Sequence, residues 1–590
     1  MQYFLRLFPY LRRSRRLLVI TLVMAALSQA AMLLMPKVVQ EIVRQVLGRP
    51  VGSIAPWALL ILLLAIIKGG LSATETILGT RVGQQVLQDL RQEVYAHICR
   101  LKLRFFDITH SGEILSRVTA DMDPIDGFFS WGARLIFRST LLFIGALSFC
   151  LNMNWRLTLV SLSFIPLISV TALIIGLRLR PAWQAAREQV GDFTSGLEET
   201  LSGIRVVKMN VQEQRENEKL TRASEIIRQK TFLANRIDAT YYPLTGLWSG
   251  VASLVILAYG GLQVIRGQLT IDQYVSFEMY IIFLMVPMRM LGWMVSGMQR
   301  AAVGARRVFE LLDEQAESLS VERSALNETP VARTINVQRS TLNGDLVFQN
   351  VSFSYRPGEP VLRDINLSVS AGEIVGVLGP TGSGKSALVA LIPRLYDPVE
   401  GRILIDDIDA RDYDLQALRR QVGMVFQEPF LFSGTIRENI VFGRPDAGPA
   451  EIEEAAKRAA IDDFIAGLEK GYDTRIGERG LNLSGGQQQR LALARTLLMD
   501  PRILILDDST SSVDADTEFR IQEALAELMV GRTSFIISQR ANSVAVANRI
   551  IVLDHGEIIE QGTPRELAQI PNGHYRKLLD VQKALSGADS

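Results

Sequence analysis

Residues 379–386 read Gly-Pro-Thr-Gly-Ser-Gly-Lys-Ser, and this stretch constrains the fold of the second half of the chain. The apolar run 373–378 before it predicts a buried parallel strand, and residues 387–392 after it predict the start of a helix. Glycines let such a loop curl so that successive N–H groups point at phosphate oxygens. A glycine-rich turn with a chance Lys-Ser pair is the alternative, and the flanking strand and helix make it the weaker one. The sequence therefore predicts an α/β domain that binds a nucleoside triphosphate.

Side chains of polar residues near this loop have predicted roles. Lys385 is expected to reach the β- and γ-phosphates, and the Ser386 hydroxyl to ligate Mg²⁺. Further on, the apolar strand predicted at 503–506 ends in Asp507 and Asp508. A carboxylate at such a strand end can hold the Mg²⁺ of a bound nucleotide. The two stretches together predict one phosphate site.

The first half of the chain has a different pattern. The protein is 48% apolar and 21% charged, with a mean hydropathy of +0.18, a mixture that indicates a membrane part joined to a soluble part. A polar linker is expected at 313–344, between a helical membrane domain at 1–312 and a nucleotide-binding domain at 345–590. Since about 30 Å of hydrocarbon must be crossed, six apolar stretches are predicted to be spans: 17–35, 57–78, 139–153, 157–177, 239–265 and 279–298.

Loop lengths and charge predict the orientation in the membrane. The connections 79–138 and 178–238 are long and polar, whereas the other three are short. Arginine-rich sequence occurs before the first span and in both long connections, so the positive-inside rule places these parts in the cytoplasm. Six spans return the nucleotide-binding domain to the same side. The expected location is the inner or plasma membrane, with the N-terminus in the cytoplasm.

Two cations fall inside predicted spans. Lys68 lies near the middle of the second span and Arg289 near the middle of the sixth. A lipid-facing charge is costly, so both are candidates for a wet cavity, unless they lie near helix ends. Methionines share one face of the sixth span, which suits either adaptable binding of apolar molecules or ordinary packing: Met279, Met290, Met294 and Met298.

A family resemblance follows from the motifs between and around the phosphate loop and the Asp507 strand. Residues 483–487 read Leu-Ser-Gly-Gly-Gln, and Gln427, 431–439, 477–480 and 511–514 also fit the pattern. The C-terminal half thus resembles the ATPase domain of ATP-binding-cassette (ABC) transporters. The six-span half, with its two long cytoplasmic connections, is similar to the exporter type. The resemblance covers nearly the whole chain.

The resemblance implies a role for each matching residue. Tyr355 would stack on adenine, and Lys385 would hold the phosphates together with the loop backbone of Gly379, Pro380, Thr381, Gly382, Ser383 and Gly384. Ser386, Gln427 and Asp507 would arrange Mg²⁺ and water. The signature would bind the γ-phosphate of ATP held by a different ATPase domain, through Ser484, Gly485, Gly486 and Gln487. A chain with one such domain is therefore expected to pair with a second half-transporter.

Two catalytic positions depart from the family pattern. A Glu usually follows the Mg²⁺-binding Asp and acts as base, and here the residue is Asp508, one methylene shorter. The switch loop usually has a His before its Arg, and here Gln539 precedes Arg540. Both changes weaken hydrolysis, because a positioned base contributes about 10²–10⁴-fold. Since the signature is intact, the chain resembles the subunit of heterodimeric exporters that supplies the weak site's Walker motifs and the competent site's signature.

Other functions stay open from the sequence. A slow homodimeric exporter, an ATP-gated regulatory ABC protein, and rescue of the base role by Glu518 are the alternatives. The expected substrates are amphiphilic or hydrophobic molecules, drug-like compounds or lipids, with peptides also open. Lysine and arginine number 63 against 62 acidic residues, so no nucleic-acid partner is indicated, and two cysteines cannot form a disulfide framework or thiolate metal site.

Overall fold

The computed structural model describes residues 2–48, 54–317, 341–356, 358–477, 480, 482–507 and 529–586, apart from some side chains inside helices. The chain divides into two compact units. The first comprises Met1–Tyr95 and Gly112–Asp313, and the second comprises Ala96–Ser111 and Glu314–Ser590. The second unit therefore includes a short segment from the first long connection between the predicted spans. Most of the predicted linker, 313–344, lies outside the described residues.

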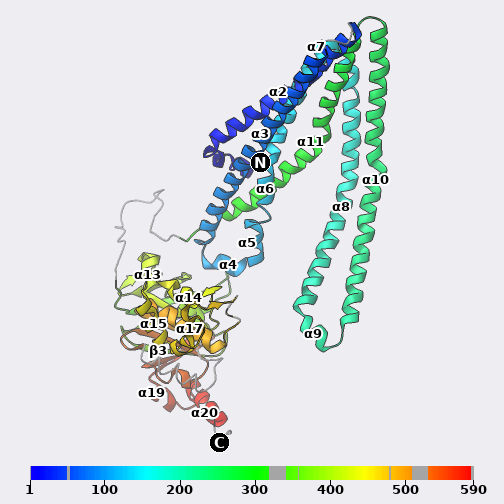
Figure 1. The fold of residues 1–590 in the computed structure, drawn as a ribbon. Helices are drawn as coiled ribbons and strands as arrows, with labels where there is room; N and C mark the ends of the chain where they lie inside the picture. Colours follow the sequence, from blue (N-terminus) through cyan, green and yellow to red (C-terminus); the bar gives the residue numbers. More distant parts are fainter. Residues whose placement is uncertain are drawn as a thin grey trace. The chain divides into compact units, whose positions relative to one another are not determined.

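Long helices dominate the described part of the first unit (Figure 1). They continue far beyond the apolar stretches, because the polar sequence that follows several of the predicted spans keeps a helical pattern. Short elements, among them α1 (Gln2–Leu5), α5 (Ser111–Val118) and α6 (Asp123–Gly127), lie between or before them. The long helices are α2 (Arg15–Gly48), α3 (Ala55–Ile98), α7 (Ala133–Leu162), α8 (Phe164–Ser202), α10 (Glu213–Ile265) and α11 (Ile271–Leu312).

Helices α2, α7 and α11 pack together around a buried apolar cluster that includes Phe277 and Tyr280. Pro36 interrupts the hydrogen-bond ladder of α2, and α11 supplies donors to carbonyls near the break. The Tyr280 hydroxyl donates to the carbonyl of Leu33 at 2.7 Å, and the Ser276 hydroxyl donates to that of Pro36 at 2.7 Å. Two carbonyls of α2 near Pro36 thus accept hydrogen bonds from α11 inside the bundle.

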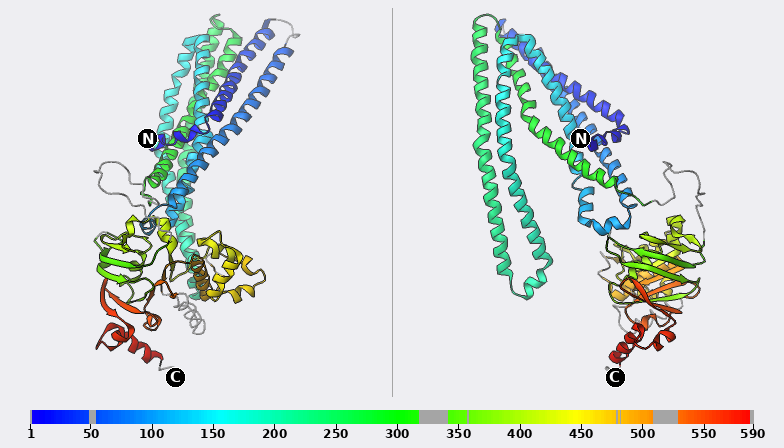
Figure 2. Two further views of the ribbon diagram at one scale, coloured as in Figure 1. Left: turned by 90° about the vertical axis from the view of Figure 1, so that its left-hand side faces the viewer. Right: turned by 180° about the vertical axis from the view of Figure 1, so that it is seen from behind.

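Helices α8 and α10 form a long antiparallel hairpin. They lie side by side along their length and are joined at one end by α9 (Ile204–Met209), as Figure 1 and the right-hand view in Figure 2 show. The apolar side chains around α9 are exposed in this chain, including Val206 and Met209. The hairpin is the structural form of the second long connection, 178–238.

The short connection predicted at 153–156 is a helix break. Within α7, Asn154 has non-helical dihedral angles of φ −160° and ψ 100°. Its side-chain oxygen accepts from the Leu157 N–H at 3.0 Å, and its amide donates to Gln263 of α10. Asn154 therefore caps a new helix that starts at 155, because a side-chain acceptor satisfies an N–H that has no helical partner. The third and fourth predicted spans are separated at this residue.

The described helices support a membrane domain. Four stretches are long and apolar enough to cross a bilayer: Arg15–Leu47, Ala55–Ile98, Ser111–Leu162 and Glu213–Ile265. The fourth and sixth predicted spans lie mainly in α8 and in α11, where several side chains fall outside the description. Within Ala55–Ile98, the apolar window is not buried by the rest of this chain. Such a surface suits lipid or a neighbouring subunit.

The described part of the second unit contains two main sheets. A four-stranded antiparallel sheet has the order β2 (Leu362–Val369), β1 (Leu346–Phe353), β4 (Glu400–Ile405) and β5 (Ile408–Asp409). A six-stranded sheet has the order β12 (Glu557–Gly562), β11 (Arg549–Asp554), β3 (Ile374–Leu378), β10 (Thr533–Ser538), β9 (Ile503–Asp507) and β6 (Val422–Val425). Its strands from β11 to β6 are parallel, and only β12 is antiparallel.

The two larger of the three apolar clusters in the described part of this unit lie against the strands that carry the site. One lies where β1, β2 and β3 meet α12 (Lys385–Ala390), and includes Phe348, Leu388 and Ile505. The other joins β9 to α14 (Ile436–Ile440), α15 (Pro449–Arg458) and α17 (Gly485–Leu498). The strands predicted at 373–378 and 503–506 are confirmed. The predicted architecture, a helical membrane domain followed by an α/β phosphate-loop domain, is confirmed as well.

Candidate functional site

The candidate site lies at the carboxyl ends of four adjacent parallel strands. The phosphate loop follows β3, Gln539 follows β10, Asp507 ends β9 and Gln427 lies just beyond β6. The register pairs Ser538 with Leu378 and Ile537 with Asp507, so these strands end at one edge of the sheet. In open parallel sheets, this edge is where ligands bind.

A cavity of about 240 Å³ at this edge brings together residues from five separate parts of the sequence. Its lining includes Tyr355, which follows β1, and Gln539, which is exposed. Val361 and Ile537 also line the cavity and make part of its wall apolar. The sequence did not indicate either residue, because an apolar residue by itself does not indicate a binding site. The predicted site residues in the lining are Tyr355, Thr381, Gly382, Gly384, Lys385, Ser386, Gln427, Asp507 and Gln539.

Glycine is required at two positions of the phosphate loop. Gly379 has a φ of +156°, and a Cβ there would lie 2.2 Å from the carbonyl oxygen of Leu553. Gly384 has a φ of +101°, and a Cβ there would lie 3.0 Å from the carbonyl oxygen of Val361. Backbone of neighbouring strands therefore leaves no room for a side chain. Close packing against β2 and β11 fixes the curvature of the loop.

The loop also positions its lysine. Lys385 is buried at the start of α12, and its ammonium group donates to the carbonyls of Gly379 at 2.9 Å and Pro380 at 2.7 Å. Ser383 is buried beside it, and within the described part of the chain its hydroxyl oxygen has no hydrogen-bond partner. Gly379, Pro380 and Ser383 do not line the cavity themselves. They form the part of the loop that lies outside the cavity lining.

The signature residues occupy a different place. Ser484 caps α17, its hydroxyl accepting from the Gln487 N–H at 3.3 Å while the Gln487 side chain accepts from the Ser484 N–H at 2.9 Å. This reciprocal capping box gives the motif a defined backbone at a helix start. None of Ser484, Gly485, Gly486 and Gln487 lines the cavity at the phosphate loop.

The residues predicted to hold Mg²⁺ offer a suitable donor set. Ser386 contributes a hydroxyl, Gln427 an amide oxygen and Asp507 a buried carboxylate, and all three line the same cavity. Mg²⁺ is a hard cation that prefers oxygen ligands and keeps several waters. The chemistry of these three side chains therefore fits the ion.

Several predictions fall outside the described residues. They concern Asp508, residues 511–514 and Glu518, and part of 477–480. The Arg289 side chain is likewise outside the description. Lys68 is half-buried in an open groove with Met35 and Thr76.

The methionine face of α11 lies partly beside a cavity. Met294 and Met298 line a space of about 410 Å³ together with Phe128 and Trp131. These aromatic residues belong to a five-residue π-helical turn, Phe128–Gly132, that leads into α7. Met290 is exposed, whereas Met279 is half-buried. The predicted face is thus accessible in this chain at Met290 and beside the cavity.

Known proteins match both halves of the chain. Residues 18–288 match the family model for the ABC transporter transmembrane region, and residues 362–511 match the model for ABC transporter. An ATP-dependent lipid A-core flippase of Syntrophus aciditrophicus is 37% identical over 524 residues, covering 89% of this chain and 85% of that protein. A fatty acid ABC transporter ATP-binding/permease protein of Mycobacterium bovis is 37% identical over 493 residues, covering 84% and 76%.

The fold matches a solved structure along almost its whole length. A bacterial Atm1-family ABC exporter with ATP bound has a TM-score of 0.80 to this chain and 29% identity, covering 96% of this chain and 98% of that one. Long membrane helices joined to a phosphate-loop sheet define an ATP-driven membrane transporter. The chain belongs to the ABC transporter family, and its domains are those of an exporter half-transporter. It is a multi-pass membrane protein whose ATPase domain binds and hydrolyses ATP to drive transport.

Proposed function

We propose that the chain is one subunit of a dimeric ABC exporter that moves amphiphilic molecules outward across the inner or plasma membrane. The observation that carries this proposal is the single cavity in which Tyr355, the phosphate loop, Gln427, Asp507 and Gln539 meet. In this proposal Tyr355 stacks on adenine and Lys385 pairs with the phosphates. The arginine-rich connections support a cytoplasmic position for the ATPase domain and the N-terminus.

Mg²⁺ is proposed to bind at Ser386, Gln427 and Asp507. The support is their shared oxygen chemistry and their common place in the cavity lining. When bound there, the ion neutralises charge on the phosphates. Lys385, which lines the same cavity, supplies a further positive charge.

We also propose that the chain's own ATP site is the weak one of a heterodimer. Gln539 reaches the cavity with a neutral amide, which does not take up a proton as an imidazole does. Asp508 carries its carboxylate one methylene closer to the backbone than Glu would. The signature, in contrast, is intact and capped at the start of α17. It would therefore complete the competent site on the partner.

The substrate class is proposed from the membrane unit and from relatives. One relative is named as a lipid A-core flippase and another as a fatty acid transporter, and both cargoes are amphiphiles. The cavity beside Met294 and Met298 has apolar and aromatic walls with Asp123 and Arg300 also in its lining. Flexible methionine side chains adapt to varied apolar partners. Lipids or drug-like amphiphiles fit such a surface better than small polar solutes.

The test uses the purified complex in vesicles. ATP-dependent accumulation of a fluorescent fatty acid or a lipophilic dye is measured, together with photolabelling of this subunit by 8-azido-ATP. Lys385→Ala should weaken labelling about 10-fold or more, since a hydrogen bond to a charged group is worth about 1.5–3 kcal/mol. Lys470→Ala, at an exposed lysine of the same unit, is the matched control. Unchanged labelling of Lys385→Ala would refute the assigned site, and a complex that transports neither probe would refute the proposed substrate class.

A further inference from the structure

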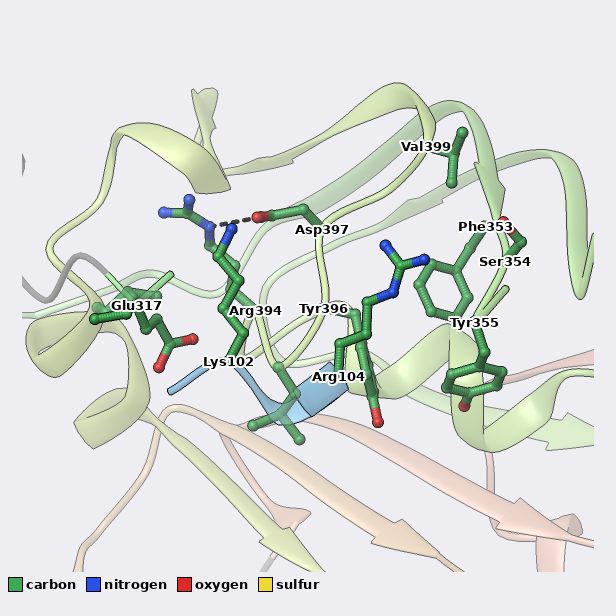
Figure 3. A pocket seen from close by; sticks show the side chains of 13 residues that line it. Lys102, Arg104, Glu317, Phe353, Ser354, Tyr355, Arg394, Tyr396, Asp397 and Val399 are labelled. Carbon is green, nitrogen blue, oxygen red and sulfur yellow. Dashed lines mark hydrogen bonds and ion pairs between the residues drawn. The ribbon is translucent and has the colours of Figure 1, made fainter. Parts of the chain in front are cut away.

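Three aromatic rings pack against one another beside the candidate adenine site (Figure 3). Tyr355 and Tyr396 meet edge to face, with ring centroids 5.2 Å apart and planes at 87°. Phe353 touches both, with centroids 4.9 Å from Tyr355 and 5.4 Å from Tyr396. Edge-to-face contacts are favourable and depend on orientation. A change in the orientation of the Tyr355 ring therefore alters its packing against Tyr396.

Tyr396 also holds a residue far away in the sequence. Its hydroxyl donates to the Asp107 carboxylate at 2.8 Å, although the two residues are 289 positions apart. Asp107 lies on α4 (Leu103–Ile108), within the segment Ala96–Ser111 that belongs to the same compact unit as the ATPase sheets. This segment continues directly from α3 and leads into α5. The chain therefore links α4 covalently to α3 on one side and to α5 on the other.

A second set of contacts holds the loop that carries Tyr396. Arg419 of α13 (Leu415–Gln421) donates to the carbonyls of Pro393 at 3.1 Å and Arg394 at 2.8 Å. The same guanidinium makes two hydrogen bonds with Glu317, at 2.6 and 2.9 Å. The Glu317 N–H in turn donates to the carbonyl of Arg100 at 2.5 Å. The loop after α12 and the segment Ala96–Ser111 are thus connected at two places.

The protonation of Tyr396 supports a lasting contact. Burial raises the pKa of the Tyr396 phenol, and the hydrogen bond to Asp107 raises that pKa further. The phenol therefore remains a neutral donor at physiological pH. Burial raises the pKa of Tyr355 too, so both rings are uncharged where they meet. Neither ring is expected to lose the contact by titration.

We propose that Tyr396 is a positioning residue that connects the base-facing Tyr355 to Asp107 of α4, so that a purine base bound on Tyr355 is signalled to Ala96–Ser111. The inference rests on the proposed function, in which Tyr355 stacks on adenine. A ligand shifts a conformational equilibrium only through contacts that differ between states. In this proposal, the base makes such a contact with the Tyr355 ring. Tyr396 packs directly against Tyr355, so a shift of the Tyr355 ring changes the position of Tyr396. Phosphates alone would bind the loop without moving this ring.

The test places a reporter on the segment itself. A fluorophore is attached at Lys102→Cys in a Cys99→Ser background, in which the remaining Cys150 is buried. ATP and inorganic tripolyphosphate, which has no base, are compared in the assembled complex. In the parent protein the reporter should respond to ATP and hardly to tripolyphosphate. In Tyr396→Phe and in Asp107→Asn this difference should fall about fivefold or more, while ATP binding and basal ATPase stay within about twofold, because only one hydrogen bond is removed.

Tyr472→Phe is the matched control. Its hydroxyl donates to the Asp462 carboxylate at 2.6 Å in the same unit, away from α4, so it loses the same kind of bond. The double variant of Tyr396→Phe and Asp107→Asn should be no worse than either single variant, since both remove one contact. Additive effects would overturn the inference, as would a parent reporter that responds equally to ATP and tripolyphosphate, or single variants that behave like Tyr472→Phe. If the parent chain fails to bind ATP at all, the proposed function fails first, and the inference with it.

Discussion

At the scale of single residues, the charge cluster around Glu75 shows how the membrane unit accommodates ions. Glu75 of α3 is fully buried, and its carboxylate lies 3.6 Å from Arg138 and 4.0 Å from Arg134 of α7. Arg134 also donates to the Glu75 carbonyl at 3.0 Å. Gly79 lies one turn further along α3, and a Cβ there would lie 2.3 Å from the Arg134 side chain. The glycine thus makes room for the arginine that pairs with the carboxylate.

Removing the charge of Glu75 should destabilise the protein. In Glu75→Gln the two arginines lose their counter-charge, and breaking a buried ion pair costs about 3–5 kcal/mol. The apparent melting temperature of the detergent-solubilised protein should therefore fall clearly below that of the parent. Glu113→Gln is the control, because Glu113 pairs with Arg117 at a more exposed position on α5. Equal melting temperatures for the two variants would show that the Glu75 cluster is not a stabilising pair.

At the scale of elements, α11 combines a packing face and a methionine face. Tyr280 and Leu284 are buried against α2 and α7, whereas Met294 and Met298 line the cavity with Phe128 and Trp131. The 3.6-residue period of a helix allows both faces in one element. Whether the methionine face contacts transported molecules depends on access from water in the assembled exporter.

Cysteine substitution tests the methionine face. In the Cys99→Ser background, Met290→Cys and Met294→Cys should react with a water-soluble maleimide in at least one nucleotide state, because a transport pathway opens to water. Leu284→Cys, at a buried position of the same helix, is the control and should stay unreactive. Reaction is followed by mass shift with and without ATP. If neither methionine position reacts in either state, the face contacts lipid or packed protein instead.

At the scale of the whole molecule, the proposed heterodimer gives one ATPase domain two roles. Its phosphate loop forms the weak ATP site, and its signature completes the competent site of the partner. The cavity at Lys385 includes Gln539, one of the two departures from the family pattern, whereas the signature at the start of α17 keeps its sequence and its cap. A domain of this kind contributes to two sites if it pairs with another. Changes at the two places should therefore affect turnover unequally.

Steady-state ATPase of the purified complex measures this difference. Asp508→Ala should lower the rate by about twofold or less, since little turnover passes through a site with an impaired base. Gly485→Glu should lower it far more, because the competent site loses its γ-phosphate contact. For comparison, losing the general base of a working site costs about 10²–10⁴-fold. Lys470→Ala is again the control. If Asp508→Ala lowers the ATPase rate as much as Gly485→Glu does, the chain hydrolyses ATP at its own site. A homodimer then explains the activity better than a heterodimer.

Local features were predictable from the sequence because they depend on neighbouring residues. The phosphate loop needs glycines at fixed spacing, and a buried strand such as β9 needs a short apolar run. The same holds for the apolar stretches that became long membrane helices. The place of Gln427 beside the loop came from the family resemblance, and that of Asp507 from its position at the end of an apolar strand; the parallel sheet then brought the strand ends together. The break at Asn154 fits the short connection expected there.

Contacts between distant residues were decided only by the tertiary structure. No pattern in the sequence pairs Asp107 with Tyr396, or assigns Ala96–Ser111 to the ATPase unit rather than to the helices on either side of it. Likewise, the clearance at Gly79 exists because Arg134 of another helix crosses α3 at that point. Propensity and periodicity act over a few residues, whereas such contacts depend on how closed loops and packed side chains fill space. The sequence therefore determined the elements and the nucleotide-binding motif, and packing determined which of its distant residues meet.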